Sequence, residues 1–124
     1  MNINIKATNI ELTPELKNYV EQKVNVLEKH IYHEIDDSVK AWVEVGKISE
    51  HHQKGDVYRA EIQIHIPRNA KGARAEATHY DIFAAIDKAQ DEIKIEIEKE
   101  KNKKVSLARR GGRLFKKLIP FFGE

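Results

Sequence analysis

The chain has 124 residues, close to one average domain, of which 40% are hydrophobic and 34% are charged. It contains no run of about 18 apolar residues, which a membrane span requires, and no signal-peptide pattern. It also has no cysteine, which excludes disulfides, thiolate metal sites and a cysteine nucleophile. We therefore expect a cytoplasmic protein with one domain and at most a short additional segment.

The small net charge of +2 conceals an uneven distribution. Residues 1–98 carry 13 basic and 18 acidic side chains, a net charge of −5. Residues 99–124 carry 9 basic and 2 acidic side chains, a net charge of +7. A mildly acidic body with a strongly basic end predicts contact between that end and a polyanion, either a nucleic acid or an anionic membrane surface.

The first predicted elements are a strand and a helix. Apolar and polar residues alternate over residues 1–8, which predicts a half-buried strand. The segment 13–15 is Thr-Pro-Glu and predicts a helix start, because threonine caps a free N–H and proline suits the first helical position. An apolar stripe then indicates about five helical turns: Leu16, Val20, Val24, Leu27 and Ile31.

Three strands and a second helix follow. Alternation predicts strands over residues 39–45, 58–66 and 73–78, with a polar loop over 46–55. Residues 78–81 can form a capping box that starts the second helix. Its apolar stripe contains Ile82, Ile86, Ala89, Ile93 and Ile97, and it fades into a lysine-rich segment at 99–104.

The element order predicts the fold class. The order β-α-β-β-β-α and the one-sided strands indicate an α+β fold, with a four-stranded mixed sheet and two helices packed on one face. The first helix makes a right-handed crossover between two parallel strands, and the other strands form an antiparallel meander. We place the domain at residues 1–104 and a basic, partly amphipathic C-terminal tail at residues 105–124.

Several short segments resemble one known family. The runs NIELTPEL at 9–16, YVEQKV at 19–24 and LEK at 27–29 are similar to the opening of the ribosome hibernation-promoting factors, also called ribosome-associated inhibitors or subunit-interface proteins. The runs RAEA at 74–77 and DIFAAID at 81–87 resemble the start of that family's second helix. The resemblance covers about residues 1–104, and the chain has no room for the ribosome-pairing module of the longer members, so it resembles the short type.

The resemblance implies a function and a partner. Proteins of this family bind the small ribosomal subunit near the decoding region and occupy the space of tRNA and mRNA, which holds ribosomes idle under stress. Their rRNA contacts come largely from basic residues on the two helices. The positions that match are Lys23, Lys29, Lys99 and Lys103, and Lys94 can substitute in part for a neighbouring position. Three positions that are usually basic are not basic in this chain: Val26, Glu92 and Ile95.

The basic tail supplies further candidates. Arginine gives bidentate contacts to phosphate, and the Gly111-Gly112 pair lets a flexible backbone approach RNA closely. We expect this tail to compensate for the helix charges that are missing. The complete rRNA-binding prediction is Lys23, Lys29, Lys94, Lys99, Lys103, Lys104, Arg109, Arg110 and Arg113, with Arg74 and Lys88 as weaker candidates.

The same tail supports an alternative function. Leu114, Phe115, Leu118, Ile119, Phe121 and Phe122 interleave with basic residues. Such a segment is typical of a module that binds an anionic membrane surface or the groove of a partner protein. A general binder of double-stranded RNA is a third hypothesis.

Catalysis and metal binding have little support in the sequence. There is no G-x-S-x-G motif, phosphate-cradling glycine loop or H-E-x-x-H motif. His30 and His33 have a spacing that ligands can adopt, and His51 and His52 are adjacent, but neither pair belongs to a metal motif. Trp42 is a lone aromatic on a polar strand face. We expect no enzyme activity, cofactor, metal or small-molecule substrate, and a monomer off the ribosome.

Overall fold

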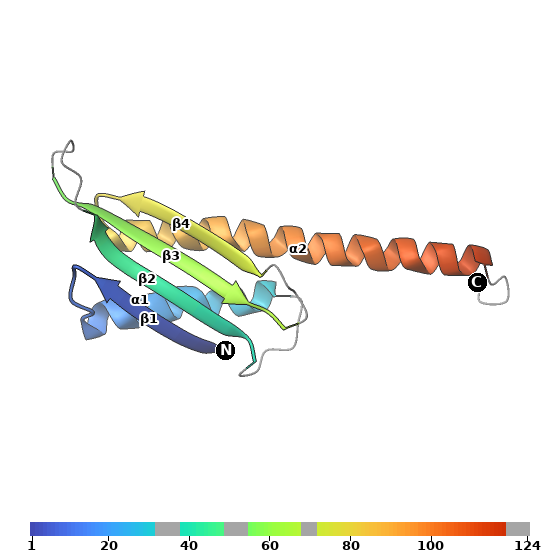
Figure 1. Cartoon of the computed structure of the whole chain (residues 1–124), viewed down its shortest axis with the longest axis horizontal. Coiled ribbons are helices and arrows are strands. Elements are labelled where there is room, and N and C mark those ends of the chain that lie inside the picture. The colour runs from blue at the N-terminus through green and yellow to red at the C-terminus, as the bar shows by residue number, and fades with distance from the viewer. Residues whose placement is uncertain (32–37, 49–54, 68–71, 119–124) are drawn as a thin grey trace.

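The computed structural model describes residues 1–31, 38–48, 55–67 and 72–118, with side chains up to residue 99 and at Asn102. Its elements follow the predicted β-α-β-β-β-α order, with a short 3₁₀ helix after the first α-helix (Figure 1). They are β1 (Asn2–Thr8), α1 (Pro14–Asn25), η1 (Val26–His30), β2 (Lys40–Ile48), β3 (Val57–His65), β4 (Ala73–His79) and α2 (Ile82–Leu118).

The four strands form one mixed sheet in the order β1-β2-β3-β4. Strand β1 pairs with β2 in parallel, and the other two pairs are antiparallel, as predicted. The predicted loop at 46–55 begins too early, because β2 continues to Ile48, where it pairs with Val57. This cross-strand pairing extends the strand beyond the alternating pattern.

Both helices cover the same face of the sheet (Figure 1), which confirms the predicted layers. The two predicted apolar stripes and the inward strand residues form one core. The inner face of β4 consists of Ala73, Ala75 and Ala77, all buried, and α2 packs across β4 and β3. Small side chains on β4 let the helix lie close to the sheet.

Helix α1 begins as predicted but ends differently. The Oγ1 of Thr13 accepts a hydrogen bond from the N–H of Leu16 at 3.2 Å, and Pro14 occupies the first turn. The five-turn α-helix was wrong in its last part, because residues 26–30 form a 3₁₀ helix. Tighter turns are common at helix ends, where the last carbonyls lack α-helical partners. Leu27 and Ile31 remain buried, so the predicted apolar stripe still faces the core over its full length.

The start of α2 also differs from the prediction. Asp81 caps this helix through its own carboxylate, which accepts a hydrogen bond from the N–H of Phe83 at 3.3 Å. The predicted capping box at residues 78–81 was wrong because Thr78 still belongs to β4, where it pairs with Arg59. Its carbonyl accepts a hydrogen bond from Nζ of Lys88 at 3.3 Å.

Helix α2 is much longer than the body of the protein. It continues to Leu118, across the predicted boundary after residue 104, and projects beyond the sheet (Figure 1). The backbone at 109–113, which we expected to be flexible, is therefore helical. Within α2, residues 82–98 carry a net charge of −3, whereas residues 99–118 carry nine basic side chains and one acidic. No helix in the described part of the chain is both long and apolar enough to span a membrane.

Candidate nucleic-acid interface

An aromatic and ionic cluster joins α1 to α2. The rings of Tyr19 and Phe83 meet edge to face with centroids 4.9 Å apart. The hydroxyl of Tyr19 donates a hydrogen bond of 2.6 Å to Oδ1 of Asp87. That bond raises the pKa of Tyr19 above its ordinary value of 10.0. The cluster therefore helps to set the relative position of the two helices, and its two rings pack against the core.

Lys23 is part of this cluster and is not a free cation. Its Nζ lies 3.2 Å from Oδ1 of Asp87 and 5.4 Å from the centroid of the Tyr19 ring. The hydrogen bond to Asp87 raises the pKa of Lys23, so the ammonium stays charged. A phosphate that approaches Lys23 must compete with a carboxylate already in place.

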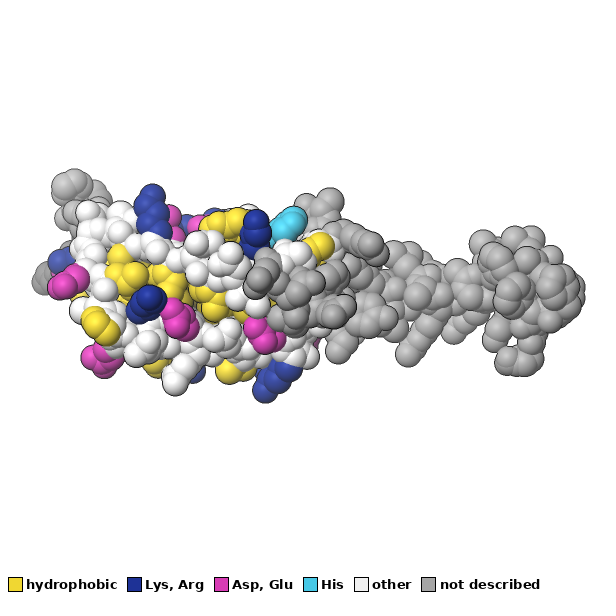
Figure 2. Space-filling model, turned by 90° about the horizontal axis from the view of Figure 1, so that it is seen from below, with side chains coloured by type: hydrophobic (Ala, Val, Ile, Leu, Met, Phe, Trp, Pro, Cys, Tyr) yellow, Lys and Arg dark blue, Asp and Glu magenta, His cyan; other side chains and the backbone are white. Residues whose placement is uncertain are grey.

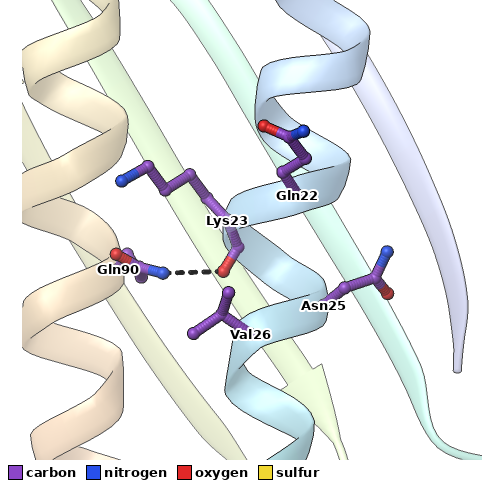
Figure 3. Close-up of a pocket in the computed structure, with 5 residues that line it drawn as sticks. All are labelled: Gln22, Lys23, Asn25, Val26 and Gln90. Atoms are coloured by element: carbon purple, nitrogen blue, oxygen red, sulfur yellow. Dashed lines mark hydrogen bonds between the residues drawn. The ribbon is translucent and has the colours of Figure 1, made fainter.

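A groove of about 710 Å³ lies beside Lys23, on the outer side of the two helices. Its lining consists of Gln22, Lys23, Asn25, Val26 and Gln90 (Figure 3). The Nε2 of Gln90 donates a hydrogen bond of 2.9 Å to the carbonyl oxygen of Lys23, which bridges the helices at this point. Val26, a position where a basic residue was expected, exposes 46% of its surface.

Two other predicted lysines on the helices are available to a ligand. Lys29 on η1 and Lys94 on α2 are exposed, and their side chains have no hydrogen bond or ion pair within the described ranges. Lys99 lies 3.5 Å from Oε1 of Glu96, an exposed pair of low strength. These three lysines remain candidates for phosphate contacts.

The remaining predicted cations lie along the projecting half of α2. The helix backbone carries Lys103, Lys104, Arg109, Arg110 and Arg113, which span about 15 Å at 1.5 Å per residue. The predicted set therefore separates into three lysines on the body, at positions 23, 29 and 94, and a row on the helical projection that starts at Lys99. Sequence reasoning had assigned these residues to a domain and a tail, whereas one helix carries the row without a break.

The two arginines on the uncovered face of the sheet are paired with carboxylates. Nε of Arg59 lies 3.0 Å from Oε2 of Glu76, and Arg59 also contacts Glu44 and Glu61. Arg74, a weaker candidate, forms ion pairs with Glu61 and Glu76, so its charge is compensated. The bond from Arg59 holds the pKa of Glu76 below its ordinary value of 4.5. Three carboxylates therefore surround two guanidinium groups on this face.

The surface of the body is mixed in charge elsewhere too. Figure 2 shows basic and acidic side chains interspersed on the side of the body that it presents. Lys88, the other weaker candidate, donates to the carbonyl of Thr78. Trp42 is 43% exposed and stands between Asn4 and Gln63 without an aromatic neighbour among the described side chains, so it offers no stacking platform.

The histidine pairs do not identify a metal site. His30 contacts Oε1 of Glu98 through its Nδ1 at 3.0 Å. His33, His51 and His52 lie outside the described residues, as do Ile119, Phe121 and Phe122 of the tail. Within the described ranges, no three histidine, aspartate or glutamate side chains are grouped in a way that could hold a metal ion.

Sequence reasoning missed the partners of the predicted cations. Asp87, Tyr19 and Gln90 become relevant only when the two helices lie side by side, because 68 residues separate Tyr19 from Asp87. The spacing of Gln22, Asn25 and Val26 on one helix was readable, but the facing helix could not be placed from it.

The fold and the charge distribution define a small α+β binding domain with a basic helical projection. The chain belongs to the family described as sigma 54 modulation protein / S30EA ribosomal protein, whose model matches residues 3–105. The predicted resemblance to ribosome hibernation factors is thereby confirmed.

Two relatives illustrate the match. The chain is 32% identical over 103 residues to the ribosome hibernation promotion factor of Bacillus subtilis. The aligned region covers 83% of this chain and 50% of that protein. It is 31% identical over 107 residues to the ribosome hibernation promoting factor of Pseudomonas putida, and here the aligned region covers 86% of this chain and 93% of that protein. The chain thus spans about half the length of the Bacillus, Deinococcus radiodurans and Lactococcus lactis factors.

Solved structures agree with this fold. The N-terminal domain of Thermus thermophilus Protein Y superimposes with a TM-score of 0.65 at 29% identity, covering 80% of this chain and 98% of that one. A ribosomal subunit interface protein from Coxiella burnetii superimposes with a TM-score of 0.63 at 16% identity, covering 82% and 99%. The second likeness concerns the fold alone.

Proposed function

We propose that the chain is a ribosome hibernation factor, which binds the small ribosomal subunit through rRNA near the decoding region. Bound there, it blocks the tRNA and mRNA sites under stress and so inhibits translation. It acts in the cytoplasm by binding and not by catalysis, and it is a monomer off the ribosome. Membership of the family and the names of its relatives support this proposal.

The observation that carries the proposal is the charge of the helical projection. Residues 99–118 continue α2 and carry nine basic side chains against one acidic. At 1.5 Å per residue they form a rod of about 30 Å. A helix holds these cations at a fixed spacing, so less conformational entropy is lost on binding than for a flexible tail. Contacts with rRNA phosphates then release counterions and make the affinity dependent on salt.

The body contributes fewer contacts. Lys29 and Lys94 are free to meet phosphates, whereas Lys23 is held by Asp87. We therefore assign most of the electrostatic affinity to Lys99, Lys103, Lys104, Arg109, Arg110 and Arg113. The shape of the helix layer supplies the remaining complementarity to folded rRNA.

Co-sedimentation with small ribosomal subunits across a salt series tests this proposal. The variant Arg109→Gln/Arg113→Gln removes two charges from the projection, and Lys6→Gln/Lys40→Gln removes two exposed charges from the open sheet face as a matched control. We expect saturation near one chain per subunit. The slope of log K against log salt concentration should become shallower by about 1.5 in the first variant and stay unchanged in the control.

Other outcomes would reject the proposal. Binding in large excess that disappears at moderate salt would indicate general polyanion affinity, and naked duplex RNA bound as tightly as subunits would indicate a double-stranded-RNA binder. Binding to anionic vesicles without binding to subunits would favour the membrane alternative.

A further inference from the structure

The groove between α1 and α2 is polar but carries little net charge. Three of its five lining residues are carboxamides, namely Gln22, Asn25 and Gln90. Its single cation, Lys23, is compensated by Asp87 at 3.2 Å. A phosphate would find no free positive charge among these residues. The chemistry of the groove favours a neutral ligand with hydrogen-bond donors and acceptors.

Two of the carboxamides are available to such a ligand. Asn25 and Val26 follow Gln22 at i+3 and i+4, so both are its neighbours on the surface of α1 at the junction with η1. Val26 lies on the side toward Gln90, and Asn25 extends on the other side (Figure 3). Gln22 and Asn25 are exposed, and neither side chain has a hydrogen bond within the described part of the chain. Gln90, by contrast, is tied to the Lys23 carbonyl at 2.9 Å and fixes the opposite wall (Figure 3).

An unpaired base fits this combination of groups. A planar carboxamide offers a donor and an acceptor side by side, and Asn and Gln pair in this way with the amino group and ring nitrogen of adenine. The exposed side chain of Val26 and the aliphatic stem of Lys23 provide apolar surface against which a flat ring can lie. The volume of about 710 Å³ is ample for one base.

We propose that this groove binds one unpaired adenine base of RNA. The inference rests on the proposed function, which makes RNA the partner, and adds base recognition to binding that is otherwise directed at phosphates. Val26 then has a positive role, since a basic residue there would replace the apolar wall with a charge. Sequence-specific RNA recognition generally uses unstacked bases, whose edges are accessible.

The test compares short single-stranded oligoadenosine and oligouridine of equal length, which carry the same charge. Fluorescence anisotropy with the full chain should give about five- to tenfold tighter binding of oligoadenosine. Gln22→Ala/Asn25→Ala should abolish this preference without weakening binding of oligouridine. Asn18→Ala, an exposed amide on the same helix outside the groove lining, is the matched control and should keep the preference.

Salt separates the base contact from the phosphate contacts. Raising the salt concentration should weaken the binding of both oligonucleotides in parallel and leave the ratio of their affinities unchanged, because Asp87 compensates the charge of Lys23 in the groove. Equal affinity for the two oligonucleotides, or a preference that survives in Gln22→Ala/Asn25→Ala, would overturn the inference. One-to-one binding to small subunits without adenine preference would reject only the groove, whereas adenine preference without subunit binding would reject the proposed function.

Discussion

Oδ1 of Asp87 on α2 accepts the hydrogen bond of Tyr19 and also lies 3.2 Å from the ammonium of Lys23 on α1. One carboxylate oxygen therefore joins the two helices and compensates the lysine that the family resemblance offers as an rRNA contact. The affinity of this face for phosphate depends on whether rRNA can displace Asp87 from Lys23.

Replacing Asp87 should strengthen binding to rRNA. Asp87→Asn keeps an acceptor for Tyr19 but frees Lys23, so we expect two- to fivefold tighter binding to small subunits and a steeper salt dependence. Both partners are partly exposed, so the loss of the ion pair should cost less than about 1 kcal/mol of stability. Co-sedimentation and chemical denaturation measure the two effects.

The control for this variant is Asp91→Asn. Asp91 is exposed, lies one turn further along α2 and has no ion pair within the described ranges. If both variants tighten binding equally, net charge alone is responsible and the special role of Asp87 is rejected. The pKa of Tyr19, measured by NMR, should fall toward 10.0 only in Asp87→Asn, because its largest cause is the bond to Asp87.

The sheet face should contribute to stability in a pH-dependent way. The bond from Arg59 lowers the pKa of Glu76 in the folded state, so the unfolded chain binds more protons near that pKa. This contribution is complete above the ordinary value of 4.5 and is lost as pH falls through the lowered folded value. Arg59→Gln should therefore make Tm fall less steeply as the pH is lowered below about 5. An unchanged acid profile would contradict this, and Lys40→Gln on the same face is the control.

The parallel pair β1–β2 should depend on Gly46. A Cβ at this position would lie 2.7 Å from the backbone carbonyl oxygen of Thr8, which cannot move without breaking the pairing. We expect Gly46→Ala to destabilise the fold by about 2 kcal/mol. Urea denaturation measures the loss, and a variant as stable as the parent would show that the strands can separate at this point.

The helical projection should respond to its glycine pair. Gly111 and Gly112 lie inside α2, where each glycine disfavours the helix by about 1 kcal/mol relative to alanine. Gly111→Ala/Gly112→Ala should raise the helical signal in far-ultraviolet circular dichroism. If the projection binds rRNA as a helix, this variant should also bind at least as tightly as the parent. A stronger helical signal with weaker binding would show that the segment binds in another conformation.

The architecture could be predicted because its signals are local. Alternation identified the four strands, and the stripes from Leu16 to Ile31 and from Ile82 to Ile97 identified both helices and their buried faces. The errors concern the ends of helices and strands, where tertiary contacts decide which residue is the last of the element. Pairing with β3 extended β2 to Ile48, and membership of β4 prevented Thr78 from capping α2.

The basic residues of the candidate interface were predicted from the sequence, but the ion pairs that compensate some of them were not. The sequence by itself determined the α+β order, the buried stripes and the basic segment, because periodicity and charge are properties of neighbouring residues. Only the tertiary structure decided that Asp87 compensates Lys23, that Glu61 and Glu76 compensate Arg74, and that a groove lined with amides lies between the helices. These relationships join residues far apart in the chain, and ionic and hydrogen-bond energies depend on distances that only packing sets.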